Sequence, residues 1–365
     1  MYSLLVGMSH RSDDKSALTE CCMPEDEHGH GESDAHTNLS AQVSEPESCP
    51  VGDDHPDLSP HPHQQKATST KGSRLVSYRI PPRRLALSGG GVRAIAHVGA
   101  IRVFHEHGFL RCLDEVLGVS AGALFALMLS LGYTIGEIED LNLKFDFTLL
   151  RNPDPDFLFV FTETLGIDKG EALERLIISI LRQKGFSPTA TFADLRDRRP
   201  AFRCFATDIA TNQSREFSIV VSPNISIVTA VRASMSLPLY YTPVTDPETG
   251  NLLMDGGLLH NLPHGHVLTL PDSWGLYFIN PAKPSVEPTI FHQIYDSVIK
   301  LRYTRLLREY DDFLIRIPCA DTSPIHFDIT LEERKTMIAT AAAAATAFLF
   351  RRNPVLHPKR RFSAS

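Results

Sequence analysis

A serine lies between two glycines where one apolar run ends and another begins, in VLGVSAGAL at residues 116–124. The run EVLGV before it is typical of a buried strand, and AGALFALMLSLG after it is typical of a buried helix. A sharp strand-to-helix turn would hold Ser120 over the carboxyl end of a sheet and would require tiny residues at Gly118 and Gly122. The spacing therefore predicts a nucleophile elbow, although a small residue chosen for tight packing would leave the same pattern.

Three consecutive glycines, Gly89, Gly90 and Gly91, lie at an earlier junction of the same kind, in LALSGGGVRAIAHVGAI. Glycines allow successive backbone N–H groups to converge on a negatively charged atom. Acyl transfer needs such donors, because the oxygen of its tetrahedral intermediate is anionic and each well-aimed donor contributes roughly 3 kcal/mol. This loop is therefore a candidate oxyanion hole.

The same letters also fit a dinucleotide fingerprint of the form G-x-G-x-x-A, with Asp114 as the acidic partner of a ribose. Asp114, however, precedes the next predicted strand instead of ending it, and a dinucleotide site leaves Ser120 unexplained. A phosphate-binding P-loop would need a Lys-Ser/Thr ending, which this stretch lacks. The oxyanion hole is the favoured interpretation, and the dinucleotide site is its alternative.

An acidic residue in NLLMDGGLLHNLP is the candidate base, because a predicted strand leads from Asn251 directly to Asp255, Gly256 and Gly257. Carboxyl ends of strands in open α/β sheets carry the sites of such folds. A simple turn is the alternative, since Asp-Gly is a common turn dipeptide. An α/β-hydrolase would instead use a histidine late in the chain. The later histidines are His260, His264, His266, His292, His326 and His357.

The elements that must position these residues alternate between strands and helices. The predicted strands cover 84–88, 115–119, 201–209, 215–220, 251–255, 275–279 and 313–317. The predicted helices cover 92–108, 121–132, 135–145, 169–185, 225–235, 289–310 and 331–352, the last one starting at a capping box of Thr330 and Glu333. This alternation predicts a mostly parallel sheet with helices on both faces.

The order and spacing of GGGVR, GVSAG and DGG resemble the patatin-like phospholipases over roughly residues 84–345, supported by ATDIAT at 206–211 and VRASMSLPLYYTPV at 231–244. The resemblance implies a three-layer α/β/α fold and a lipid acyl hydrolase of the phospholipase A or lysophospholipase type, without metal or cofactor. It implies a catalytic dyad of Ser120 and Asp255 without histidine, and an oxyanion hole of Gly89, Gly90, Gly91 and Arg93. The family usually has glycine where this chain has Ala94.

Two further alternatives stay open from the sequence. One is an esterase with a Ser/His/Asp triad, and the other is a lipid-binding protein that keeps the fold without turnover. Arg93 has two possible roles, contact with a lipid phosphate or an ion pair that anchors its helix. His97 is expected to be a packed helix residue, Asp208 a turn residue, and Asn261 a brace of the Asp255 loop. The apolar stretch 157–161 fits either a lid or a core element.

The two ends of the chain differ in charge from the domain predicted at 73–350. Residues 1–72 hold 13 acidic and four basic side chains, which predicts a disordered acidic tail. The basic segment 351–365 is expected to help hold the protein on anionic membranes. For the protein as a whole, the expected binding partners are an acyl lipid and a membrane surface, and no nucleic acid.

Solubility and compartment follow from what the chain lacks. The start has no positive n-region, so no signal peptide is predicted. The longest apolar run, at 337–350, is too short to span a bilayer. Six scattered cysteines favour reduced thiols. We therefore expect a cytoplasmic protein that binds membranes peripherally, and Cys21, Cys22, His28 and His30 match no structural zinc pattern.

Overall fold

The computed structural model describes residues 81–268, 270, 272–279, 309–319 and 322–352. The predicted acidic tail and the histidines and cysteines in it lie outside the described residues. The same holds for most of the predicted helix 289–310, for His292 and His357, and for residues 353–365 of the basic tail. The predictions made for these segments stay predictions.

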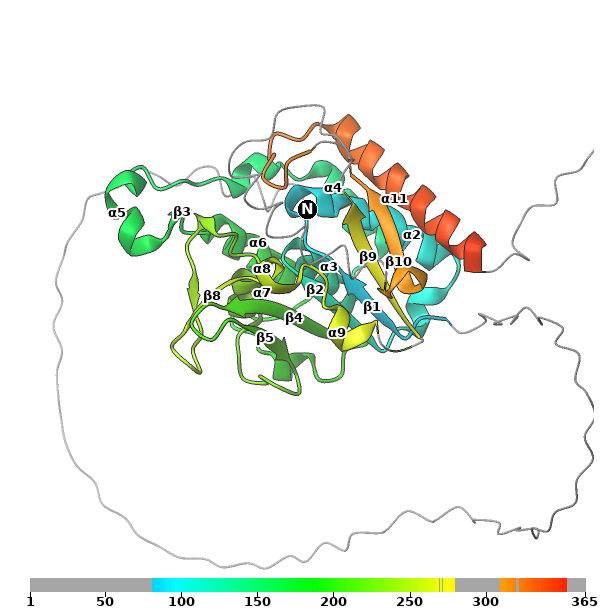
Figure 1. The fold of residues 1–365 in the computed structure, drawn as a ribbon, viewed down its shortest axis with the longest axis horizontal. Coiled ribbons are helices and arrows are strands. Elements are labelled where there is room, and N and C mark those ends of the chain that lie inside the picture. Colours follow the sequence, from blue (N-terminus) through cyan, green and yellow to red (C-terminus); the bar gives the residue numbers. More distant parts are fainter. Residues whose placement is uncertain (1–80, 269, 271, 280–308, 320–321, 353–365) are drawn as a thin grey trace, which may run out of the picture. The chain divides into compact units, whose positions relative to one another are not determined.

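A mostly parallel sheet of eight strands forms the centre of the described chain (Figure 1). Strands β10, β9, β1, β2 and β4 lie side by side in that order and pair in parallel, whereas β5, β7 and β8 pair antiparallel. Their bounds are β1 (Arg84–Leu87), β2 (Glu115–Val119), β4 (Ala201–Asp208), β5 (Gln213–Ser218), β7 (Val244–Thr245), β8 (Leu252–Asp255), β9 (Ser273–Ile279) and β10 (Leu314–Pro318). The predicted α/β class is confirmed.

All seven predicted strands are present, and one is displaced along the chain. The strand predicted at 215–220 lies at 213–218, because its antiparallel register runs from Asp208 opposite Gln213 to Arg203 opposite Ser218. Alternation of residue types does not mark where such a hairpin ends. Three short strands were not predicted. β7 pairs with β8 at the edge of the main sheet, and β3 (Gly166–Asp168) and β6 (Leu239–Tyr241) form a separate parallel pair.

The six predicted helices that lie in the described chain are present, one of them divided. The segment 92–108 starts as a 3-10 helix and continues as an α-helix, a common arrangement at helix N-termini. The α-helices are α2 (His97–Glu106), α3 (Ala121–Ser130), α4 (Ile135–Lys144), α5 (Phe157–Thr164), α6 (Glu171–Gln183), α7 (Ile227–Ser234), α8 (Gly257–His260), α9 (His264–Val267) and α11 (Leu331–Arg352). Of these, α5, α8 and α9 were not predicted as helices. The 3-10 helices are η1 (Gly91–Ala96), η2 (Phe109–Cys112), η3 (Phe147–Leu150), η4 (Phe192–Leu195) and η5 (Asp311–Phe313).

Helix α11 begins at the predicted capping box and packs along α2. The N–H of Glu333 donates to the Thr330 hydroxyl at 3.3 Å, and the Thr330 N–H donates to the Glu333 carboxylate at 2.7 Å. A Cβ at Gly99 in α2 would lie 1.9 Å from the Ile338 carbonyl oxygen, so only glycine permits this approach. The alanine-rich run of α11 thus serves close helix packing. Among the described residues, no helix is both long enough and apolar enough to cross a bilayer.

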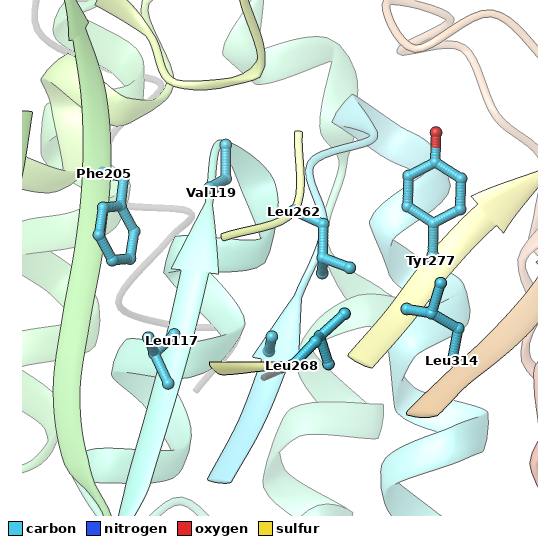
Figure 2. Close-up of a cluster of buried hydrophobic side chains, with 8 residues drawn as sticks. Leu117, Val119, Phe205, Leu262, Leu268, Tyr277 and Leu314 are labelled. Atoms are coloured by element: carbon cyan, nitrogen blue, oxygen red, sulfur yellow. The ribbon is translucent and has the colours of Figure 1, made fainter. Parts of the chain in front are cut away.

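The opposite face of the sheet carries a compact apolar cluster (Figure 2). Strand residues Leu117, Val119, Phe205 and Tyr277 contribute to it and are at most 4% exposed. Leu262 and Leu268, which follow α8 in the chain, cover the cluster and are also buried. This burial anchors the segment that follows Asp255 against the sheet.

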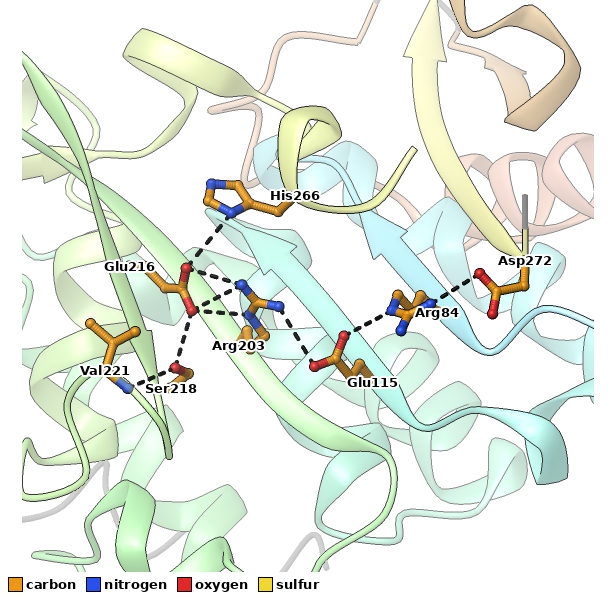
Figure 3. A network of polar contacts seen from close by, with 8 residues as sticks. All are labelled: Arg84, Glu115, Arg203, Glu216, Ser218, Val221, His266 and Asp272. Atoms are coloured by element: carbon orange, nitrogen blue, oxygen red, sulfur yellow. Dashed lines mark hydrogen bonds and ion pairs between the residues drawn. The ribbon is translucent and has the colours of Figure 1, made fainter. Parts of the chain in front are cut away.

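A ladder of alternating charges crosses four neighbouring strands (Figure 3). Arg84 in β1 pairs with Glu115 in β2 at 3.1 Å, and Arg203 in β4 pairs with Glu216 in β5 at 3.0 Å. A contact of 3.6 Å between Arg203 and Glu115 links the two pairs. Each pair is partly exposed and therefore contributes little alone, but opposite charges on adjacent strands favour one register.

Candidate active site

Ser120 is held in a strained turn between β2 and α3. Its backbone has φ 54° and ψ −133°, a conformation that side-chain-bearing residues rarely adopt and that costs about 1–3 kcal/mol. A Cβ at Gly118 would lie 2.3 Å from the Gly122 carbonyl oxygen, and a Cβ at Gly122 would lie 2.4 Å from that of Leu87. Glycine is required at both positions, as the predicted elbow demands.

A second serine, Ser234 at the end of α7, stabilises the turn at Ser120 through a hydrogen bond to its backbone. Its hydroxyl accepts a hydrogen bond from the Ser120 N–H at 2.9 Å and donates to the Phe205 carbonyl at 2.7 Å. Ser234 is fully buried. This role of Ser234 cannot be predicted from the sequence, because nothing in its local pattern connects α7 to a turn more than a hundred residues earlier.

Strand β4 brings Ser120 and Asp255 together. Strand β5 occupies one edge of β4 along 203–208, so β2 and β8 must share the other edge. β2 pairs with this edge as far as Val119 opposite Phe205, and β8 takes over where Asp255 lies opposite Ala206. The two strands approach head to head, which leaves Ser120 and Asp255 adjacent where both strands end.

Asp255 is 2% exposed, and its carboxylate accepts a hydrogen bond from the Gly257 N–H at 2.7 Å. Burial raises the pKa of Asp255 to about 6, while the neighbouring Ser120 hydroxyl and the Gly257 N–H act in the opposite direction. A Cβ at Gly256 would lie 2.3 Å from the Phe205 carbonyl oxygen. The DGG sequence thus combines a buried acid, a close approach and a backbone donor.

The glycine-rich loop lies directly beside Ser120. A Cβ at Gly89 would lie 2.9 Å from the Ser120 Cβ. The Gly89 N–H donates to the Asn261 carbonyl at 3.0 Å, and the Asn261 side-chain amide donates to the Gly89 carbonyl at 3.2 Å. The amide of Gly89 is therefore already engaged, and Asn261, which was expected to brace the Asp255 loop, binds the glycine loop through these two bonds.

Arg93 fixes the peptide that joins Gly90 to Gly91. Its backbone N–H and its side-chain Nε both donate to the Gly90 carbonyl, at 3.2 and 3.4 Å. In a trans peptide the N–H of Gly91 points opposite to that carbonyl. Within the described part of the chain, the N–H groups of Gly90 and Gly91 donate to no acceptor. Gly91 has φ 56°, and a Cβ there would lie 2.0 Å from the Pro324 carbonyl oxygen, so this position also requires glycine.

Ser120 and Asp255 lie in the wall of an apolar pocket of about 880 Å³, the space at its open end included. Gly91, Ala94 and Ala121 line it beside them, whereas Arg93 does not. The rest of the wall consists of side chains from several helices and loops, namely Val92, Ile95, Leu124, Phe125, Met128, Leu141, Asn142, Phe145, Phe147, Leu150, Leu173, Leu176, Met235, Leu237, Tyr241, Pro324, Ile325 and Phe327. The pocket therefore combines one hydroxyl–carboxylate pair with a long apolar wall.

No described histidine lines this pocket. His260, His264 and His266 lie together at a smaller cleft, where His266 approaches Glu216 at 3.7 Å (Figure 3), and His326 is exposed. His97 is a packed helix residue, as predicted. Its Nε2 lies 2.9 Å from the Ser88 carbonyl oxygen, and burial lowers its pKa to about 4.

The remaining polar candidates have structural partners. Asp114, the acidic residue of the dinucleotide alternative, forms an ion pair with Arg83. Asp208 is a turn residue, as expected, and accepts bonds from the N–H groups of Ala210 and Thr211. Among the described residues, no group of three or more His, Cys, Asp or Glu side chains is arranged to hold a metal ion. The stretch 157–161 forms most of α5, which contacts β3.

A strained serine elbow, a buried aspartate and a glycine loop on an α/β sheet define a class of protein with a serine-centred site. The sequence model of the family described as Patatin-like phospholipase matches residues 85–268, and the chain belongs to this family. It is similar to the protein YqhO of Bacillus subtilis (strain 168), with 32% identity over 48% of this chain and 63% of that protein. It is also similar to neuropathy target esterase sws of Drosophila sechellia, with 32% identity over 49% of this chain and 11% of that protein.

A solved structure shows the same fold. VipD from Legionella pneumophila has a TM-score of 0.53 and 17% identity, over 74% of this chain and 67% of that one. At this identity the likeness concerns the fold alone. The chain spans less than two thirds of the length of the two relatives named above.

Proposed function

We propose that this chain is a lipid acyl hydrolase in which Ser120 is the nucleophile and Asp255 the general base. The observation that carries the proposal is that the hydroxyl of the strained Ser120 lies beside the buried carboxylate of Asp255, in the wall of an apolar pocket. Membership of the patatin-like phospholipase family supports it. Catalysis by a serine and a base alone requires that the base be ionised and close, and both conditions fit Asp255.

In the first half of the reaction, Ser120 Oγ attacks the acyl carbonyl carbon while its proton moves to Asp255. A base is most effective when its pKa lies near the working pH, and a pKa of about 6 leaves Asp255 ionised yet more basic than a free aspartate. The oxygen of the tetrahedral intermediate becomes an anion. The N–H groups of Gly90 and Gly91 and the positive end of α3 are the proposed donors that stabilise it.

In the second half, the intermediate collapses and the leaving alkoxide takes the proton from Asp255, which leaves an acyl group on Ser120 Oγ. A water molecule then attacks the acyl carbon and gives its proton to Asp255. Collapse of this second intermediate returns the proton to Ser120 and releases the fatty acid. Asp255 is ionised again at the end, so the cycle needs no other proton carrier.

The substrate class follows from the pocket. Its wall is almost entirely apolar, so it fits a long acyl chain, and the leaving head group would lie on the open side. A phospholipid or lysophospholipid has this form. Ala94 adds its methyl group to the buried part of this wall, where the family usually has glycine. In this proposal Ala94 affects the fit of the chain and not the oxyanion donors.

Arg93 is the proposed positioning residue of the oxyanion loop. It is buried, bonds the Gly90 carbonyl and does not line the pocket, which favours anchoring over contact with a lipid phosphate. Its action on the reaction would pass through the peptide that carries the Gly91 N–H.

The proposal is tested by hydrolysis of a lipid panel with the full chain. Phospholipids, lysophospholipids and neutral acyl esters are incubated with the wild type and with Ser120→Ala, and released fatty acid is measured. We expect release from at least one long-chain ester by the wild type and none above background by the variant. Release that is equal in both proteins, or absent in both, contradicts the proposal.

Replacing the later histidines one at a time is expected to leave at least about a tenth of the activity, since no imidazole takes part in the proposed chemistry. Six variants, at His260, His264, His266, His292, His326 and His357, are compared with the wild type in the same assay. Loss of several orders of magnitude in one folded variant would move the protein to the Ser/His/Asp class.

We also propose that the protein works at membrane surfaces from the cytoplasm. A lipid hydrolase must reach its substrate in an aggregate, and the basic segment 351–365 would attract anionic lipid. Only Arg351 and Arg352 of that segment lie in the described chain, at the end of α11.

A further inference from the structure

Two exposed leucines flank the pocket wall on neighbouring segments. Leu149, in η3, is 52% exposed and precedes the pocket residue Leu150. Leu239, in β6, is 49% exposed and lies between the pocket residues Leu237 and Tyr241. The Tyr241 hydroxyl donates to the Leu150 carbonyl at 3.2 Å, which joins the two segments. Both leucines therefore lie at the solvent side of one wall.

Leu239 is held in an unfavourable backbone conformation. Its φ of 65° belongs to the left-handed region, which favours glycine and, among residues with side chains, asparagine and aspartate. Any of these would fit the backbone better and would also expose less apolar surface. A half-exposed leucine at such a position indicates that its side chain is used.

The charges of the surrounding segments do not favour an anionic partner. Arg151, next to η3, pairs with Asp328 at 3.0 Å, and Lys169, next to β3, pairs with Asp154 at 2.9 Å. Segments 146–156 and 166–169 together hold three aspartates that are not buried, Asp146, Asp154 and Asp156, against these two cations. Their basic groups are thus already neutralised, and the balance is acidic. Attraction to this surface must come from its apolar side chains.

We propose that Leu149 and Leu239 form the surface through which the chain docks on uncharged phospholipid. This inference rests on the proposed function, because the same wall leads into the pocket that takes the acyl chain. Two leucines inserted between head groups would place the open side of the pocket at the membrane surface, so that an acyl chain can enter without crossing water. Such docking is apolar and therefore insensitive to salt, in contrast to attraction by the basic segment 351–365.

Vesicle co-sedimentation of the full chain tests the proposal. Phosphatidylcholine vesicles are used at about 0.1 M and about 0.5 M sodium chloride, a range over which screening more than halves the reach of charge interactions. We expect the wild type to bind equally at both salt concentrations. Leu149→Asp and Leu239→Asn are each expected to weaken binding by roughly tenfold, the order given by removing one buried leucine side chain.

The matched control is Val220→Asp, which removes the most exposed of the large apolar side chains described, at 86%, from a turn that is not part of the pocket. It is expected to bind vesicles like the wild type. Leu239→Asn is further expected to unfold at the same temperature as the wild type or a higher one, since asparagine relieves the backbone. A loss of binding with retained stability separates docking from folding.

Three outcomes overturn the inference. They are wild-type-like binding by Leu149→Asp and Leu239→Asn, equal loss in Val220→Asp, and absence of wild-type binding to uncharged vesicles. A change in oligomeric state of the two leucine variants on gel filtration, with vesicle binding unchanged, would instead assign the surface to a second copy. Hydrolysis of a monomeric short-chain ester is measured in parallel and is expected to stay within about twofold of wild type. If the proposed function is wrong, the wild type does not hydrolyse this ester, whatever the result of the vesicle-binding experiment.

Discussion

Ser120→Ala and Asp255→Asn are each expected to lower kcat for ester hydrolysis by about 10⁴-fold or more, because residues that act as one unit cannot replace each other. Alanine has no nucleophile, and the asparagine amide cannot accept the serine proton. The measurement is release of a fluorogenic alcohol under single-turnover conditions, which reports the acyl-transfer step. A variant that keeps wild-type activity would contradict the assignment of the residue that it replaces.

The same two variants are expected to change stability in opposite directions. The pKa of Asp255 is raised by burial from 3.8 to about 6, so between these pH values the folded state binds more protons than the unfolded state. Stability therefore falls as the pH rises through this window, and at neutral pH the buried charge costs on the order of 2–3 kcal/mol. Asp255→Asn removes the charge and should raise the unfolding temperature at about pH 7.

Ser120→Ala keeps the charge and removes the hydroxyl beside it. Because this hydroxyl favours the charged form of Asp255 and so lowers its pKa, the variant should unfold at a lower temperature than the wild type at about pH 7. Thermal unfolding followed by circular dichroism measures both shifts. If both variants are inactive while one unfolds at a higher and the other at a lower temperature than the wild type, misfolding is excluded as the cause of inactivity. A loss of stability in both would indicate that the buried carboxyl is already protonated in the wild type.

The parts of the site that could be predicted from the sequence are those carried by consecutive residues. The turn at Ser120 needs Gly118 and Gly122 because backbone atoms approach within 2.4 Å of where a Cβ would stand, and this requirement is written in five adjacent letters. The predicted strands and helices likewise depend on local patterns of apolar residues. Conformational requirements that arise between neighbouring residues can therefore be predicted from the local sequence.

Contacts between distant segments could not be predicted in this way. The Ser234 hydroxyl accepts a hydrogen bond from the Ser120 N–H, and the Asn261 carbonyl accepts one from the Gly89 N–H. The sequence around Ser234 and Asn261 contains no pattern from which these partners could be predicted. Which of three adjacent glycines has a free N–H depends on Asn261 and on Arg93. Only the folded backbone distinguishes the engaged donor at Gly89 from those at Gly90 and Gly91.

Asp255 was predicted to lie at the site because it was expected to end a parallel strand, and the observed topology differs from this expectation. The expectation rested on the carboxyl ends of parallel strands, yet β8 runs antiparallel to β4. Asp255 still reaches the site because β8 is only four residues long and ends opposite Ala206, one step beyond the point where β2 leaves the same edge. Strand length and register, rather than direction, place this carboxylate.

The rate of ester hydrolysis is expected to fall tenfold for each pH unit below about 6, and by roughly a hundredfold between pH 7 and pH 4, because the base must be ionised to accept the serine proton. The measurement is kcat/KM for a soluble ester whose own charge does not change in this range. A histidine base would give a similar fall in activity with a midpoint near pH 6.5. Temperature separates the two, since ionisation of a carboxylic acid absorbs little heat, whereas ionisation of an imidazolium absorbs much more.

The midpoint of the profile should therefore stay fixed when the assay is warmed, and a midpoint that moves to lower pH would indicate an imidazole. Unfolding in acid is the competing cause of inactivity, and the sign of the linkage excludes Asp255 as its source. Protonation of this buried carboxyl from about pH 6 down to 3.8 stabilises the folded state while it removes the base. Activity governed by Asp255 should thus be lost in the window where its contribution to the free energy of unfolding increases, and should return in full when the pH is raised.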